Sequence, residues 1–115
     1  RSALANRILD TMVARGRMDV ARFVELTSTA PARTFGLSGK GRMAVGADAD
    51  IVMWDPDSRR VLPDALHDNT GYNPFAGAEV TGRIALVLRR GVRVVADGTL
   101  HARPGSGRHV PMARV

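Results

Sequence analysis

Apolar residues at the start of the chain recur with the spacing of an amphipathic helix. Within residues 2–15 they lie about 3.6 positions apart, so that they share one face. The stripe consists of Leu4, Ile8 and Met12, flanked by Leu9 and Val13. Ser2 can cap the start of this helix, and Gly16 can end it in the left-handed conformation.

Two further helices are predicted in the first third of the chain. Asp19 is a good N-cap for a second helix, whose apolar face includes Phe23. Pro31 suits the first turn of a short third helix that stops at Gly36. Beyond Leu37 the helical pattern is lost, which marks the main boundary in the chain.

The pattern then changes to that of strands. Residues 50–54 form a candidate strand, whose apolar run from Ile51 to Trp54 predicts that it is buried and that Asp55 and Pro56 stop it. Trp54 is expected to anchor the core of a β-sandwich, because a lone aromatic residue in an apolar strand usually does so. Residues 59–62 form a weaker candidate strand.

The clearest β prediction is a hairpin in the last third. Residues 84–88 are continuously apolar, and residues 89–91 form a turn into a second strand at 92–96. Residues 63–79 lack periodicity and predict a long ordered loop, a length that is uncommon unless the loop is functional or packed against a neighbour. The tail from Arg103 is expected to be irregular.

These elements divide the chain into three parts. Residues 1–37 are helical, residues 38–100 form the β portion, and residues 101–115 form a tail. Two or three strands bury one face at most, and such a sheet needs a partner layer. The pattern therefore predicts an α+β segment whose packing partners lie elsewhere in a longer polypeptide. The chain also opens with Arg1 rather than methionine, so we expect further residues upstream.

Charge is unevenly distributed along the chain. The net charge is +6, and residues 1–79 contain ten basic and ten acidic side chains, so residues 80–115 carry all of the excess. A basic tail can steer a protein toward polyanions. However, no aromatic residue follows Phe75, and bases have nothing to stack on there. We therefore expect no nucleic-acid partner.

Composition also bears on the compartment. The chain has no cysteine, which excludes disulfides and thiolate metal ligands within it. No apolar stretch approaches the roughly 18 residues that a transmembrane helix needs, and no signal-peptide pattern is present at the start. No membrane association is expected, and the cytoplasm is the default compartment.

Three weak signals for a metal or phosphate site are better explained structurally. The aspartates at positions 48, 50, 55 and 57 lack the central glycine and final glutamate of a calcium loop, and a strand interrupts them. The histidines at positions 67, 101 and 109 lack ligand spacing. Gly105 and Gly107 lack the strand-to-helix context of a phosphate-binding loop. We predict no catalytic, cofactor-binding or metal-binding residue within this chain.

Several sequence strings together resemble the end of hydantoinases and dihydropyrimidinases in the amidohydrolase superfamily. They are Leu26-Thr27-Ser28-Thr29-Ala30-Pro31-Ala32-Arg33, Phe35-Gly36-Leu37, the run from Gly41 to Pro56, Tyr72-Asn73-Pro74-Phe75, Val80-Thr81-Gly82 and Pro104-Gly105-Ser106-Gly107-Arg108. The resemblance covers most of the chain, from about Arg17 to Arg108. Gly71 and Ala76 depart from it, because relatives commonly carry acids there.

The resemblance implies a fold and an activity for a longer parent. The fold is a (β/α)8 barrel with an accessory β-sandwich, and this chain would supply the last barrel helices, strands of the sandwich and a tail that packs on neighbouring subunits. The barrel would carry two divalent metal ions, usually zinc, that activate a hydroxide to open a small cyclic amide such as a hydantoin or dihydropyrimidine. All metal ligands would lie upstream of this chain. The parent would be a homotetramer.

Two alternatives stay open at this point. The same scaffold occurs in non-catalytic relatives whose barrels lack the ligands, and the strand motif alone also fits allantoinases and dihydroorotases. Tyr72 and Phe75 are the one place where function can involve this chain directly, through a contact between subunits. A loop packed within its own chain is the competing explanation for both residues.

Overall fold

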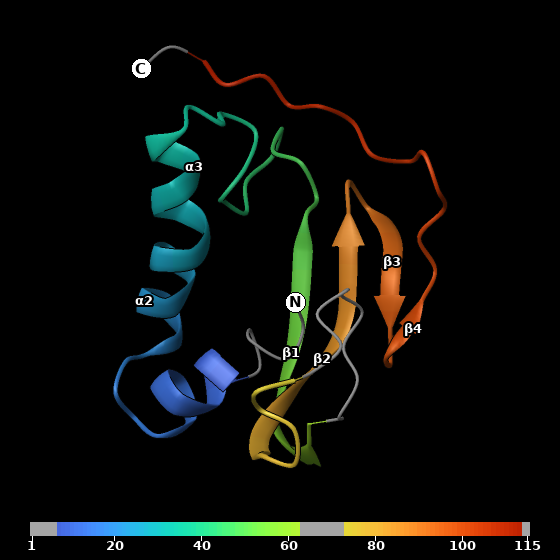
Figure 1. The fold of residues 1–115 in the computed structure, drawn as a ribbon. Helices are drawn as coiled ribbons and strands as arrows, with labels where there is room; N and C mark the ends of the chain where they lie inside the picture. The colour runs from blue at the N-terminus through green and yellow to red at the C-terminus, as the bar shows by residue number, and fades with distance from the viewer. Residues whose placement is uncertain (1–6, 63–72, 114–115) are drawn as a thin grey trace.

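The computed structural model describes residues 7–62 and 73–113, which form a helical arm beside one antiparallel sheet. The helical segments are η1 (Leu9–Ala14), α2 (Val20–Val24), η2 (Glu25–Thr29) and α3 (Ala30–Thr34). The strands are β1 (Ile51–Val61), β2 (Glu79–Arg89), β3 (Val92–Ala96) and β4 (Thr99–Leu100), in the spatial order β1-β2-β3-β4. Figure 1 shows the helical arm along the β1 side of the sheet. The predicted α+β class is therefore confirmed.

The first helical segment ends where the sequence indicates, but it buries a different face. Gly16 adopts a φ of +68°, and its N–H donates to the carbonyl of Val13. Leu9 is buried, together with Asp10, whereas Ile8 is exposed. The predicted stripe is therefore rotated by about one residue, because η1 packs against β2 through the Leu9 side. Leu4 and Ser2 lie outside the described residues.

The second and third predicted helices form one continuous helix. The Asp19 carboxylate accepts a hydrogen bond from the N–H of Arg22 at 2.7 Å and caps its start, as predicted. The residues at both internal junctions keep right-handed helical angles. A π-helical turn, η2, ends two residues before Pro31, whose ring lacks an N–H and crowds the carbonyl four residues back, within η2. Pro31 lies in the first turn of α3, and Gly36 follows the end of that helix with a φ of +62°, as predicted. The structure differs in joining α3 to α2 without a break, which the wider turn of η2 allows.

Strand β1 is longer than predicted, because Asp55 and Pro56 do not stop it. It spans Ile51–Val61 and joins the two candidate strands into one. Its pairing with β2 is interrupted between Asp55 and Arg59, where the register shifts. Pro56 lies within this irregular stretch, where no ladder hydrogen bond is required of it.

The predicted hairpin is confirmed. Strands β2 and β3 are joined through Arg90 and Gly91, whose positive φ angles of 48° and 76° match a tight two-residue turn. Strand β2 begins at Glu79, five residues before the predicted start, because β1 provides a partner along that extra length. Part of the predicted loop at 63–79 lies outside the described residues, and residues 74–77 form a turn.

The buried apolar cluster lies at one end of the sheet rather than around Trp54. Leu62 and Val80 are 1% and 2% exposed, and Phe75 and Ala78 pack against them. Trp54 is half-buried and lies over the backbone of Gly82. The expectation that Trp54 anchors the core is therefore not met within the described residues.

Candidate functional site

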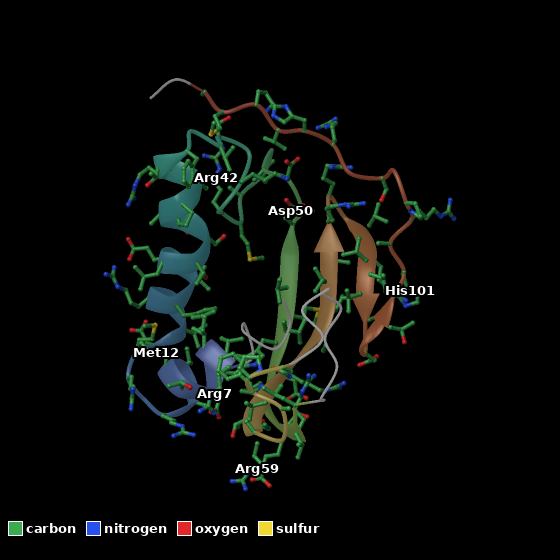
Figure 2. The ribbon with its side chains drawn as sticks, in the orientation of Figure 1. Arg7, Met12, Arg42, Asp50, Arg59 and His101 are labelled. Carbon is green, nitrogen blue, oxygen red and sulfur yellow. The ribbon has the colours of Figure 1, made fainter. Side chains whose placement is uncertain are left out.

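The densest set of charged contacts joins the loop after α3 to the β2–β3 turn. Lys40 Nζ binds Asp48 Oδ2 at 2.8 Å and also contacts the Asp50 carboxylate. The other oxygen of Asp50, Oδ1, accepts a hydrogen bond from the N–H of Arg90 at 2.7 Å. Asp50 lies just before β1, at the end of the sheet where α3 also ends (Figure 2). These contacts connect the loop, the start of β1 and the hairpin turn.

The electrostatics of this cluster favour the charged form of each group. Hydrogen bonds to Asp48 and then Asp50 raise the pKa of Lys40 above its ordinary value. Burial alone would raise the pKa of Asp50, but the hydrogen bonds from Lys40 and from the N–H of Arg90 outweigh burial and lower that pKa. Both groups are therefore charged around neutral pH. Groups held in this way suit a structural bridge rather than proton transfer.

A second charged contact connects η1 to the sheet. Asp10 is only 4% exposed, and its Oδ1 accepts a hydrogen bond from the backbone N–H of Thr81 on β2 at 2.9 Å. Its Oδ2 lies 3.4 Å from Nη2 of Arg15 and 3.7 Å from Nη1 of Arg7. The sequence interpretation missed Asp10, although a carboxylate inside an apolar helical stripe is a signal that could have indicated it.

A third charged contact crosses the sheet through Arg83. Its guanidinium contacts Asp55 Oδ2 at 3.3 Å and Asp97 Oδ1 at 3.0 Å. Hydrogen bonds to Asp55 and then Asp97 raise the pKa of Arg83. All three side chains are partly or largely exposed, so the contribution to stability is small. Sequence reasoning treated Asp55 as a strand terminator and missed this role.

Of the two residues predicted to form a subunit contact, the structure describes only Phe75. Phe75 packs against the Leu62 and Val80 cluster of its own chain, whereas Tyr72 lies outside the described residues. His101 follows β4 at the edge of the sheet away from α2 and α3 (Figure 2), and His109 lies in the exposed tail.

The described residues do not fit a metal centre. Across residues 7–62 and 73–113, no three histidine, aspartate or glutamate side chains come close enough to hold a metal ion. Asp48 and Asp50 share Lys40 instead, and Asp55 binds Arg83. We therefore assign no chemical step to these carboxylates. No helix among these residues has the length and apolar character needed to cross a bilayer.

The sequence matches the model of the amidohydrolase family over residues 1–94, well over half of its length. The chain belongs to the amidohydrolase family. This family is metal-dependent, which agrees with the chemistry that the resemblance implies. Residues 95–113 lie beyond the matched range and include the end of β3, β4 and the tail.

Individual relatives within this family are hydantoinases. The chain is 44% identical over 104 residues to a D-hydantoinase from Geobacillus stearothermophilus, and 45% identical over 98 residues to a D-phenylhydantoinase from Escherichia coli. These alignments cover 89% and 84% of this chain, but 22% and 21% of the relatives.

Solved hydantoinase structures match the fold as well. A D-hydantoinase (dihydropyrimidinase) from Thermus sp. superposes with a TM-score of 0.87 at 40% identity, covering 93% of this chain and 24% of that one. An L-hydantoinase (dihydropyrimidinase) from Arthrobacter aurescens superposes with a TM-score of 0.85 at 33% identity, covering 92% and 24%. The chain therefore spans about a fifth to a quarter of the length of the relatives it matches.

Proposed function

We propose that this chain is the C-terminal scaffold segment of a metal-dependent hydrolase that opens cyclic amides such as hydantoins and dihydropyrimidines. The observation that carries the proposal is the 44% identity to a D-hydantoinase over 89% of the chain. The relatives reported above are named for hydantoin hydrolysis, which favours a catalytic parent over a non-catalytic one. The segment itself contributes packing surfaces and no reacting group.

Apolar residues that the segment leaves uncovered support this role. Val52 and Met53 of β1 are 58% and 54% exposed, and Val20 and Val24 of the helical arm are also exposed. Strand β1 is 11 residues long and lies at an edge of the sheet, so one side of its backbone has no strand partner among the described residues. Long apolar edges of this kind are normally paired or covered. We propose that the sheet is part of a larger β-sandwich and that the helical arm ends a (β/α)8 barrel.

The metal centre of the parent belongs to the same proposal. Two divalent ions, zinc by resemblance, would be held by residues of the barrel outside this chain, since the described residues bring no ligand set together. When bound, such ions supply an activated hydroxide and polarise the amide carbonyl. A homotetrameric parent is likewise part of this proposal.

A chimera tests the scaffold role. The matching segment of the Geobacillus stearothermophilus D-hydantoinase is replaced by this chain, and hydantoin opening is assayed. Because the segment supplies packing and no reacting group, kcat/KM is expected to stay within about tenfold of the parent, or ~1.4 kcal/mol of barrier. The matched control is the same enzyme with the segment deleted, which should lose activity because the apolar faces that it covers become exposed.

Two results would contradict the proposal. One is a soluble chimera that has the parent's oligomeric size and metal content but no activity. If this chain were only a scaffold, such a correctly assembled enzyme should hydrolyse hydantoin. The other is hydantoin opening by the isolated 115-residue chain above a metal-free control, because the chain would then hold its own catalytic groups.

The subunit contact through Tyr72 and Phe75 remains a proposal. Replacing both residues with alanine in the chimera is expected to lower the molar mass measured by light scattering, because two aromatic anchors are removed from an interface. Tyr72→Ala alone separates this effect from the packing of Phe75 on Leu62 and Val80. Phe35→Ala is the matched control, since Phe35 is an exposed aromatic residue outside the loop. An unchanged oligomer in the double variant would refute the contact.

A further inference from the structure

Residues 101–113 have no regular structure, yet they follow a defined path over their own chain. They leave β4, pass over one end of the sheet and reach the C-terminal end of α3 (Figure 1). We call residues 101–113 the strap. At its start the N–H of His101 donates to the carbonyl of Val94 in β3 at 2.9 Å, and two further sets of contacts hold its middle and its end.

The middle of the strap is held by the β2–β3 hairpin. Nη2 of Arg89 donates to Oγ of Ser106 at 2.5 Å, and Nη2 of Arg90 donates to the Ser106 carbonyl at 3.1 Å. The Ser106 hydroxyl in turn donates to the Arg103 carbonyl at 2.5 Å, which closes a local turn. Ser106 is part-buried between neighbours that are exposed. A single residue of the strap thus engages both arginines of the hairpin.

The end of the strap is held by Gly36, the residue that follows α3. The N–H of Ala113 donates to the Gly36 carbonyl at 3.2 Å. Gly36 has a φ of +62°, and a Cβ added to it would lie 2.3 Å from the Ala113 carbonyl oxygen. Gly36 therefore ends the helix and also leaves room for the strap to approach.

The contacts at the middle and at the end of the strap connect two parts of the fold, the β2–β3 hairpin and the C-terminal end of α3. Of the described helical segments, η1 is the one that packs closely on the sheet, through β2. The α3 end of the helical arm lacks comparable packing, and it reaches the sheet through the loop that Lys40 connects to Asp50. The strap adds a second connection, from the α3 end to the hairpin. We propose that residues 101–113 position the C-terminal end of α3 relative to the β2–β3 hairpin of the same chain.

This role differs from what the family resemblance implies, which is a tail that packs on neighbouring subunits. Hydrogen exchange of the full chain, measured by mass spectrometry, tests the strap directly. The amide of Ala113 is expected to exchange more slowly than unstructured peptide, because its N–H binds the Gly36 carbonyl. Gly36→Ala is expected to speed this exchange roughly tenfold. The alanine Cβ collides with the Ala113 carbonyl and displaces the strap.

Gly16→Ala is the matched control for this experiment. Gly16 also ends a helical segment at positive φ, at +68°, but a Cβ there meets nothing within 4 Å. Both variants therefore strain the backbone, and only Gly36→Ala collides with the strap. Equal exchange of the Ala113 amide in the two variants would overturn the proposal, as would unprotected exchange of that amide in the unsubstituted chain.

A distance measurement tests the positioning role. Because the chain contains no cysteine, Thr34→Cys in α3 and Arg93→Cys in β3 can carry the only two spin labels. The distance distribution between the labels is expected to be narrow, and to lose its single maximum when Gly36→Ala or Ser106→Ala is added. Ser28→Ala, at an exposed helical serine, is the control and should leave the distribution unchanged. A distribution that stays narrow without either contact would refute the positioning role.

Discussion

Replacing Gly82 with alanine is expected to lower the free energy of unfolding by roughly 3 kcal/mol. Gly82 lies in β2 with a φ of +91°, where an L side chain is strained. A Cβ there would lie 2.3 Å from Nε1 of Trp54 and 2.6 Å from two further atoms of the indole. The ring is rigid and half-buried, so it must move as a whole and open the β1–β2 pairing around it.

Gly77→Ala separates the two contributions to this loss. Gly77 has a φ of +73°, but a Cβ there meets nothing within 4 Å, so only backbone strain of about 1 kcal/mol applies. Urea unfolding followed by far-ultraviolet circular dichroism measures both glycine variants and also any variant without Trp54, the single tryptophan. Adding Trp54→Ala to Gly82→Ala should recover the part of the loss that the collision causes. Equal losses for the two glycine variants would contradict this explanation.

Replacing Asp10 with alanine is expected to destabilise the chain by about 2–3 kcal/mol. The carboxylate is buried, and it is the acceptor for the N–H of Thr81, which would remain without that partner next to η1. The ion pairs with Arg7 and Arg15 add less, because both arginines are considerably exposed. The loss should appear in urea unfolding and as faster hydrogen exchange at the Thr81 amide.

The amide variant separates the hydrogen bond from the charge. Asp10→Asn keeps an oxygen acceptor for Thr81 and removes only the ion pairs, so it should lose about 1 kcal/mol or less. Asp57→Ala is the control, since the Asp57 side chain is exposed and no contact is assigned to it. If Asp10→Ala unfolded at the same urea concentration as the control, Asp10 would not connect η1 to the sheet.

Much of the local structure could be predicted because it depends on residues within one turn of each other. Asp19 caps α2, Gly16 ends η1, and residues 90–91 form the hairpin turn, each as expected. The family could also be inferred from short strings, and the match over residues 1–94 confirms it.

The one prediction that relied on a local stop signal in a strand was wrong, because a neighbouring strand supplied support. Pro31 occupies the first turn of α3 as predicted, although η2 joins that helix to α2 without a break. Pro56 does not end β1, because the pairing with β2 is interrupted around it and resumes at Arg59. A proline is a break only when the backbone around it has to remain regular.

In the candidate site, too, the sequence indicates the charged residues but not the contacts that they make with distant segments. The charges of Lys40, Asp48 and Asp50 and their closeness in sequence can be read from the sequence. The hydrogen bond from the N–H of Arg90 to Asp50 depends on how the hairpin folds back. Asp10 meets Thr81 across 71 positions of sequence. Spacing along the chain carries no information about such a pair.

The sequence by itself determined the order of helices and strands, their capping residues, the hairpin and the family. These follow from the periodicity of side chains and from residues whose allowed φ angles are special, and both act over a few residues. Only the tertiary structure decided which helical face is buried, how far β1 extends, that Gly82 accommodates Trp54, and that the strap returns to Gly36. Those features depend on close packing between segments far apart in the chain, where a single methyl group decides whether two backbones can approach.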